Sequence, residues 1–182
     1  MIASMLHESF YQSSTWTDET LGVYVGSVER KGSFTEKMPL LNEQGDVVLF
    51  FSGEDFPEPG IASQLKERGH NLDLQGPGYL VHRYEEDPKF LAKLNGRFHG
   101  LVVDRRYANA VLFNDRYGMH RIYYHECEDG FYFAAEAKAI LAVRPELRKA
   151  APRGLGEMLA CGCVLENRTL FDGIYVLPMA SN

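Results

Sequence analysis

The sequence predicts an α+β domain whose strands are mainly antiparallel. The first observation is the continuous apolar run at residues 47–51, Val-Val-Leu-Phe-Phe, which is typical of a strand buried on both faces. The second is the segment 110–141, whose pattern predicts strand, turn, strand, strand and helix in succession. The third is Glu-Asp-Gly at 128–130, which indicates a hairpin between 122–124 and 131–134.

In the N-terminal half, each expected element follows from a local pattern. Residues 1–10 carry apolar side chains at helical spacing, and glycines inside 21–28 indicate a bulge or a close backbone approach in a strand. Gly69 is expected to end a helix. The expected elements, in order, are a helix end at 1–10, a polar turn at 13–15, strands at 21–28 and 47–51, and helices at 61–68, 79–86 and 88–94, with a loop at 31–37 and a turn at 75–78.

The C-terminal half is expected to contain two hairpins and two helices. Residues 98–104 and 108–113 pair as the first hairpin, and the hairpin around 128–130 follows it. One helix is expected at 136–141. Another is expected at 152–159, where Pro152 suits the first turn because no amide donor is needed there.

Composition bounds the class of protein. The chain has 182 residues, of which 45% are hydrophobic and 24% charged, as in a globular domain with a core of its own. The net charge of -6 and the lack of a basic block argue against a nucleic-acid or membrane-surface binder. No apolar run has membrane-spanning length, and the first residues do not form a signal peptide. An odd set of three cysteines without framework spacing favours a reducing, cytoplasmic compartment.

Cysteine and histidine spacing predicts neither a metal nor a cofactor. Cys161 and Cys163 are separated by one residue and lack a second pair, so we expect ordinary structural cysteines. His99, His120 and His125 are spread along strands without a ligand spacing such as His-Glu-x-x-His.

Three charged stretches have simple interpretations. Asp115 and Arg116 are expected to form an ion pair within a turn. Glu-Glu-Asp at 85–87 is expected to be a solvated helix end. Glu54 has the best claim to a function, because it follows a buried strand, where sites tend to lie.

Residues 114–124 and 133–141 resemble the N-terminal glutamine amidotransferase domain of asparagine synthetases. The family pattern is roughly R-D-x-x-G-x-x-P-L-Y-Y followed by F-A-S-E-x-K-A-L, and here the segments read N-D-R-Y-G-M-H-R-I-Y-Y and F-A-A-E-A-K-A-I-L. Asn114, Arg121 and Ala135 depart from the pattern. Segments 38–46, 94–104 and 169–178 resemble further family motifs, so the resemblance extends from His7 to Pro178.

The resemblance implies a fold and a domain arrangement. The family fold is that of N-terminal-nucleophile (Ntn) hydrolases, an αββα sandwich of two mainly antiparallel sheets. We therefore expect a domain at 1–178 and, at 179–182, the start of a linker toward an ATP-dependent synthetase domain of a longer protein. In the family, a strand that bears the nucleophile precedes the histidine matched by His7, so the first strand is expected to be missing. An unpaired sheet position must be covered, and association into a homodimer is one way to cover it.

The family's nucleophile has no counterpart in this sequence. The resemblance implies hydrolysis of the glutamine side-chain amide by an N-terminal cysteine, whose own α-amino group acts as the base. This chain begins Met1-Ile2, and its first cysteine is Cys127. No catalytic residue is therefore assigned.

An ungapped register also changes the residues that the resemblance assigns to substrate binding. The arginine that holds the glutamine α-carboxylate falls on Ser27, which cannot make a charged bidentate contact, and Arg30 would need a shifted loop. The Asn-Gly-Glu motif falls on Ser52-Gly53-Glu54, where the family's asparagine amide would stabilise the oxyanion. The aspartate that binds the substrate ammonium falls on a glycine, Gly76.

These residues leave three functions open. The first is an asparagine synthetase-like amidotransferase domain without glutaminase activity, a structural or regulatory module that binds glutamine weakly at most. The second is a glutamine-hydrolysing domain that supplies ammonia for asparagine synthesis and whose N-terminal cysteine is lost from the recorded sequence. The third is a module that binds another small amine or acid in the altered pocket.

Overall fold

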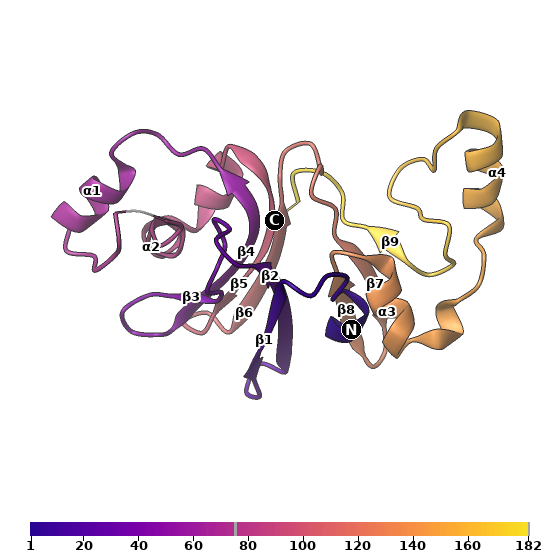
Figure 1. Cartoon of the computed structure of the whole chain (residues 1–182), viewed down its shortest axis with the longest axis horizontal. Coiled ribbons are helices and arrows are strands. Elements are labelled where there is room, and N and C mark those ends of the chain that lie inside the picture. The colour runs from indigo at the N-terminus through magenta and orange to yellow at the C-terminus, as the bar shows by residue number, and fades with distance from the viewer. Residues whose placement is uncertain (75, 182) are drawn as a thin grey trace.

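The computed structural model describes residues 1–74 and 76–181, and Figure 1 shows their arrangement. The strands are β1 (Tyr11–Asp18), β2 (Val23–Arg30), β3 (Leu40–Leu41), β4 (Val47–Asp55), β5 (Gly96–Asp104), β6 (Asn109–Asn114), β7 (Tyr123–Cys127), β8 (Gly130–Ala134) and β9 (Tyr175–Val176). The helices are α1 (Ile61–Glu67), α2 (Tyr79–Glu86), α3 (Ala137–Val143) and α4 (Pro152–Cys161), with short 3-10 helices η1 (Ile2–Ser4), η2 (Pro88–Lys93) and η3 (Pro145–Leu147).

Antiparallel pairing joins the strands of the described residues into three sheets. Their strand orders are β1-β2, β3-β4-β5-β6 and β8-β7-β9. In Figure 1, α1 and α2 cover the outer face of the four-stranded sheet, and α3 covers the outer face of the three-stranded sheet. The two larger sheets lie between these helices, which confirms the expected α+β class and is consistent with the expected sandwich. The separate β1-β2 hairpin is an addition to the two sheets that were expected.

The main core lies between the four-stranded sheet and its helices. The expected strand at 47–51 is confirmed as the first part of β4, and all five of its residues are buried. On one face of the sheet, Phe51 stacks on Phe98 with ring centroids 5.3 Å apart, and Phe98 lies 6.0 Å from Phe113. Residues of α2 such as Leu80 belong to the same buried cluster. This core makes β4 and β5 rigid supports for the polar side chains at their ends.

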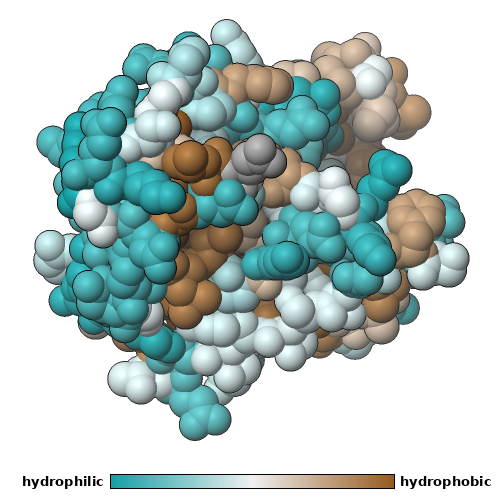
Figure 2. All heavy atoms as spheres, turned by 60° about the vertical axis from the view of Figure 1, so that its left-hand side comes forward, coloured by the Kyte–Doolittle hydropathy of each residue, from teal (hydrophilic) through white to brown (hydrophobic). Residues whose placement is uncertain are grey.

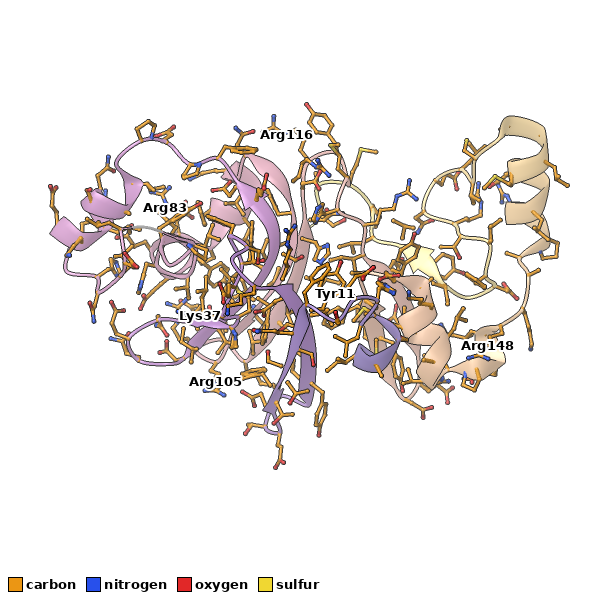
Figure 3. The ribbon with its side chains drawn as sticks, viewed as in Figure 1. Tyr11, Lys37, Arg83, Arg105, Arg116 and Arg148 are labelled. Atoms are coloured by element: carbon orange, nitrogen blue, oxygen red, sulfur yellow. The ribbon has the colours of Figure 1, made fainter. Side chains whose placement is uncertain are left out.

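The expected polar turn at 13–15 is wrong. These residues lie in the middle of β1, which pairs with β2 from Tyr11–Arg30 to Asp18–Val23. Trp16 anchors the hairpin with its ring edge-on to Phe50 of β4, at a centroid distance of 5.6 Å. Arg105, labelled in Figure 3, donates a 2.7 Å hydrogen bond to Asp18 at the end of β1. Cross-strand pairing therefore overrides the turn preference of the serines.

The N-terminal segment is also less helical than expected. In place of a helix end over 1–10, a single 3-10 turn forms at Ile2–Ser4. Met1 and Met5 pack against the second apolar cluster, which includes Ile140 of α3. Further on, His7 approaches Glu136 at 2.7 Å, and the Glu136 carboxylate also contacts Lys138 at 3.0 Å. These contacts join two stretches that the sequence resemblance had picked out separately.

Most other elements agree with the expectations. The helices expected at 61–68, 79–86, 136–141 and 152–159 are confirmed within two residues at each end, and 88–94 forms a 3-10 helix instead of an α-helix. Of the expected turn at 75–78, residue 75 lies outside the described residues. The expected solvated helix end at 85–87 is wrong for Glu85, which is half-buried and accepts a hydrogen bond from Asn42. Glu86 is exposed as expected and accepts a hydrogen bond from the exposed Arg68.

Within the described residues, none of the helices has the length and apolarity needed to cross a membrane.

Candidate functional site

The expected site residues Ser52, Gly53 and Glu54 form the last part of β4. Across the ladder with β5, Ser52 pairs with His99 and Glu54 pairs with Arg97. Gly53 has a φ of 117°, and a Cβ there would lie 2.0 Å from the carbonyl oxygen of Arg97. The two strands therefore approach closely at this point, and only glycine fits at position 53.

A turn after β6 brings His120 to the same place. Asp115 is fully buried, and its carboxylate accepts hydrogen bonds from the backbone amides of Tyr117, Met119 and His120 at 2.9–3.1 Å. The expected Asp115–Arg116 ion pair is therefore wrong, because the carboxylate serves the backbone of the turn. Arg116 lies on the outer edge of the molecule (Figure 3).

The result is an imidazole pair that spacing alone did not reveal. The His99 and His120 rings lie 5.5 Å apart, so the expectation that the histidines are merely spread along strands is wrong for these two. His125 is separate and hydrogen-bonds the carbonyl of Gly173 at 2.7 Å. The signal available in the sequence was the Asp-x-x-Gly turn, which folds the chain back toward β5.

Both imidazoles are held in the neutral form. Burial, with a smaller contribution from the neighbouring His120 ring, lowers the pKa of His99 to about 4, against the opposing effects of a backbone hydrogen bond at His120 and of the Asp115 carboxylate. Burial also lowers the pKa of His120, as does Arg97, against opposing contributions from Asp115 and Glu54. The buried Nδ1 of His99 has no hydrogen-bond partner among the described residues. The site thus offers hydrogen-bonding groups at the end of β4, and the two rings are uncharged at neutral pH.

Acidification is expected to destabilise the fold through His99. Because its pKa is about 4 in the folded chain and about 6.5 when unfolded, the unfolded chain binds more protons in between. Stability is therefore complete above the unfolded value and falls by roughly 3 kcal/mol as the pH drops to the folded value. Urea denaturation of the wild type and His99→Gln at several pH values tests this, and parallel pH profiles would refute it.

Ser27 lies on β2, which pairs with β1 and not with β4. Its hydroxyl donates a 2.7 Å hydrogen bond to Glu29 and lies 2.7 Å from the Ser14 hydroxyl across the hairpin. The Glu29 carboxylate would repel a substrate carboxylate at this position. Arg30 does not compensate, since its guanidinium lies over the Phe10 ring at 5.8 Å.

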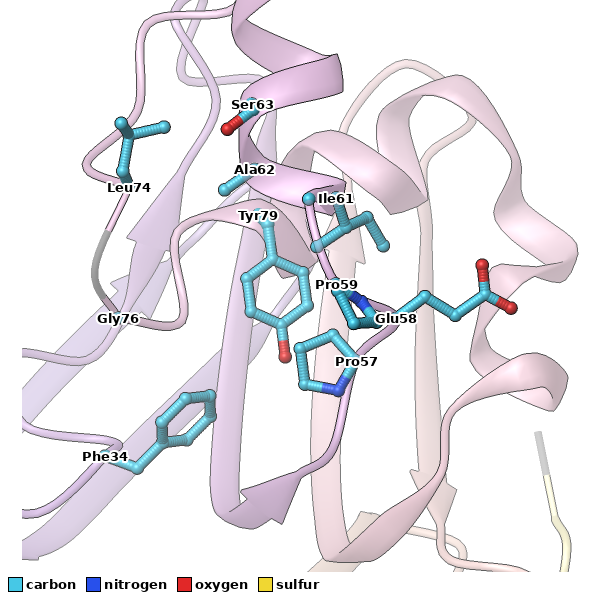
Figure 4. A pocket seen from close by; sticks show the side chains of 11 residues that line it. Phe34, Pro57, Glu58, Pro59, Ile61, Ala62, Ser63, Leu74, Gly76 and Tyr79 are labelled. Atoms are coloured by element: carbon cyan, nitrogen blue, oxygen red, sulfur yellow. The ribbon is translucent and has the colours of Figure 1, made fainter.

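Gly76 borders a cavity of about 320 Å³. Figure 4 shows it between the start of α1 and the ring of Tyr79, with Phe34 and Leu74 at its edges. In Figure 2, which turns the helical side forward, hydrophobic side chains line a hollow between hydrophilic rims. A Cβ at Gly76 would meet no atom within 4 Å, but its φ of 112° disfavours any other residue. The pocket is mostly apolar, and the carboxylate in its lining is that of Glu58, on the opposite side from position 76, where the resemblance calls for one.

A buried acid beside this pocket was missed by the sequence analysis. Asp55 accepts a 2.7 Å hydrogen bond from the Tyr79 hydroxyl and a 3.0 Å bond from the Asn95 amide. Burial raises the pKa of Asp55 in spite of these bonds, and the same burial raises that of Tyr79. The pair joins the end of β4 to α2, so it supports the pocket wall.

The structure therefore keeps only part of the predicted site together. Ser52, Gly53 and Glu54 are contiguous, whereas among residues 1–74 and 76–181 no hydrogen bond links them to Ser27 or Gly76. Thiols lie elsewhere: Cys127 ends β7, Cys161 ends α4, and Cys163 follows it, all three unpaired.

Comparisons with known proteins agree with one another. A family model described as a glutamine amidotransferase domain matches residues 27–182. The curated protein asparagine synthetase [glutamine-hydrolyzing] 2 of Bacillus subtilis (strain 168) is 28% identical over 110 residues, which are 58% of this chain. The match spans 14% of that relative's length.

Proposed function

The chain belongs to the glutamine amidotransferase domain family, and we propose that it is an asparagine synthetase-like member without glutaminase activity. It would serve as a structural or regulatory module of a longer protein, with the domain at 1–178 and a linker beginning at 179–182. Asn182 lies outside the described residues. The backbone amide of Ser181 donates a 3.0 Å hydrogen bond to the side-chain oxygen of Asn114.

The position of the thiols carries this proposal. Amide hydrolysis by this family's chemistry needs a thiolate beside the oxyanion donors. Neither β4, which carries Ser52–Glu54, nor its partner β5 contains a cysteine. Of the three cysteines, one ends β7, one ends α4 and one follows α4. Neutral His99 and His120 can move a proton, but they do not replace the thiolate.

The binding groups support the same proposal. Glutamine carries an α-carboxylate and an α-ammonium, each of which needs an opposite charge. Ser27 presents a hydroxyl already bound to Glu29, and Gly76 presents no side chain. We therefore propose that glutamine binds weakly at most, and that any attached synthetase domain, an ATP-dependent one by the resemblance, takes ammonia from solution.

A second candidate is a glutamine-hydrolysing domain whose cysteine lies upstream of this sequence. The observation in its favour is the intact β4 end, where Gly53 and Glu54 keep the family's residues and Ser52 offers a hydroxyl in place of the amide. In that case an added N-terminal segment would supply the thiol for asparagine synthesis.

We also propose a cytoplasmic location, which the three unpaired thiols support. A homodimer that covers a sheet edge remains part of the proposal, and size-exclusion chromatography with light scattering tests it.

The purified chain is expected to release no ammonia from millimolar glutamine above a heat-killed control. The reason is the lack of a thiolate near Ser52, and the measurement is an enzyme-coupled ammonia assay. Clear turnover would overturn the proposal, and Cys127→Ser, Cys161→Ser and Cys163→Ser would then locate the nucleophile. Calorimetric titration with glutamine separates a silent binding module from one that does not bind glutamine.

A further inference from the structure

Four side chains from three segments converge beside α2, on the helical side of the four-stranded sheet. Glu43 lies in the turn between β3 and β4, and His70 follows the end of α1. His82 and Glu85 are three residues apart on α2, so they lie on one face of the helix. Each side chain offers one ligand atom, and these atoms all lie within 4.8 Å of one another.

Their spacing fits ligands around a metal ion better than direct hydrogen bonds. The Nδ1 of His82 lies 3.5 Å from Glu43 and 3.6 Å from Glu85. The Nδ1 of His70 lies 3.8 Å from each of the same two carboxylates. Hydrogen bonds between such groups are normally about 2.7–3.0 Å long. A tetrahedral ion with bonds of about 2.0–2.1 Å separates its ligand atoms by roughly 3.4 Å.

Two of the inward-facing atoms are buried without a partner. His82 is 3% exposed, and neither its Nδ1 nor the Oε2 of Glu85 has a hydrogen bond within the described residues. A buried polar atom without a partner destabilises a fold, so two such atoms that lie 3.6 Å apart require a common explanation. A cation between them would satisfy both atoms at once.

The outward-facing atoms are held by other groups. Glu43 accepts a 2.7 Å hydrogen bond from the amide of Asn71, and Glu85 accepts a 2.9 Å bond from the side chain of Asn42. The Nε2 of His70 hydrogen-bonds Glu86 at 3.2 Å. Metal ligands are commonly oriented in this way, by a carboxylate or an amide on the far side of each ligand.

We propose that Glu43, His70, His82 and Glu85 bind one divalent transition-metal ion, for which Zn²⁺ is the best fit. Two neutral imidazole nitrogens and two carboxylate oxygens give a tetrahedral set whose two negative charges balance the charge of Zn²⁺, whereas Mg²⁺ and Ca²⁺ prefer six or more oxygens. The ion fastens the β3–β4 turn and the end of α1 to α2. It thereby fixes the start of the connection that carries Leu74 and Gly76 to the pocket. Sequence spacing did not reveal this cluster, because its residues come from three segments that only the fold brings together.

Zn²⁺ binding by the full chain tests the proposal. Protein dialysed against a chelator is titrated with Zn²⁺ by calorimetry, and Co²⁺ is added to a second sample to record the visible spectrum of tetrahedral coordination. We expect one Zn²⁺ per chain, a higher melting temperature with Zn²⁺ than with Mg²⁺, and at least tenfold weaker binding for His70→Gln. His82→Gln is a second variant, and because His70 is less buried, His70→Gln decides the matter if His82→Gln does not fold.

The matched control is His7→Gln, which also removes an imidazole beside a carboxylate, that of Glu136. It is expected to bind Zn²⁺ as the wild type does. Equal affinity for the wild type and His70→Gln would overturn the proposal, since binding would then be adventitious. Failure of the wild type to bind Zn²⁺, or equal stabilisation by Mg²⁺, would overturn it as well and leave only ion pairs between histidines and glutamates.

Discussion

Replacing Asp115 with alanine is expected to lower the free energy of unfolding by at least about 4 kcal/mol. The carboxylate is completely buried and accepts backbone hydrogen bonds from Tyr117, Met119 and His120. Hydrogen bonds to a charged group contribute roughly 1.5–3 kcal/mol each, and alanine leaves all three amides without their acceptor. Urea denaturation followed by circular dichroism measures the loss.

Asp115→Asn is the matched control, because one side-chain oxygen remains as an acceptor. We expect it to lose clearly less stability than Asp115→Ala. Equal denaturation midpoints for the wild type and Asp115→Ala would show that the turn does not depend on the carboxylate.

Asp115 also has a predictable pH dependence. Burial tends to raise its pKa, but the amides of His120, Met119 and Tyr117 outweigh burial, so its pKa is lowered in the folded chain. A carboxylate of lowered pKa stabilises the fold above its unfolded value, and this stability is lost as the pH falls through the folded value. The wild type should therefore lose stability below about pH 4 that Asp115→Ala has already lost.

At Asp115 the sequence predicted the local turn but not the hydrogen-bond partners of the side chain. The Asp-x-x-Gly spacing correctly predicted a turn, because aspartate and glycine have strong local preferences there. The partner of the carboxylate was predicted wrongly as Arg116, since a neighbour in sequence was preferred over the backbone of the turn itself. The meeting of His99 with His120 depends on that backbone and was missed for the same reason.

The remaining differences come from contacts between distant segments. The strand at 47–51 was predictable because burial on both faces needs an unbroken apolar run. Residues 13–15 have no such pattern, and only pairing with β2 makes them a strand. Alignment with the family pattern singled out Ser27 but not its partner. The Ser27 hydroxyl meets Glu29 because residues two apart lie on the same face of β2.

Gly53→Ala is expected to destabilise the chain by roughly 3–5 kcal/mol, since backbone strain and overpacking each cost about 1–3 kcal/mol. The φ of 117° is disfavoured for alanine, and the new Cβ would lie 2.0 Å from the carbonyl oxygen of Arg97. Because that oxygen belongs to the paired strand β5, neither atom can move without disturbing the ladder. Gly156→Ala is the control: it lies in α4 with no atom within 4 Å, so stability should be unchanged or rise slightly.

Thermal and urea denaturation of the two variants separate a structural from a functional role for this glycine. If Gly53→Ala unfolds at the wild-type midpoint, the close approach of β4 and β5 is not a constraint. The expected loss would mean that backbone geometry alone requires glycine here, whether or not glutamine is hydrolysed. The family's glycine at position 53 is then no evidence for activity, and the question of activity rests on where a thiol can reach Ser52.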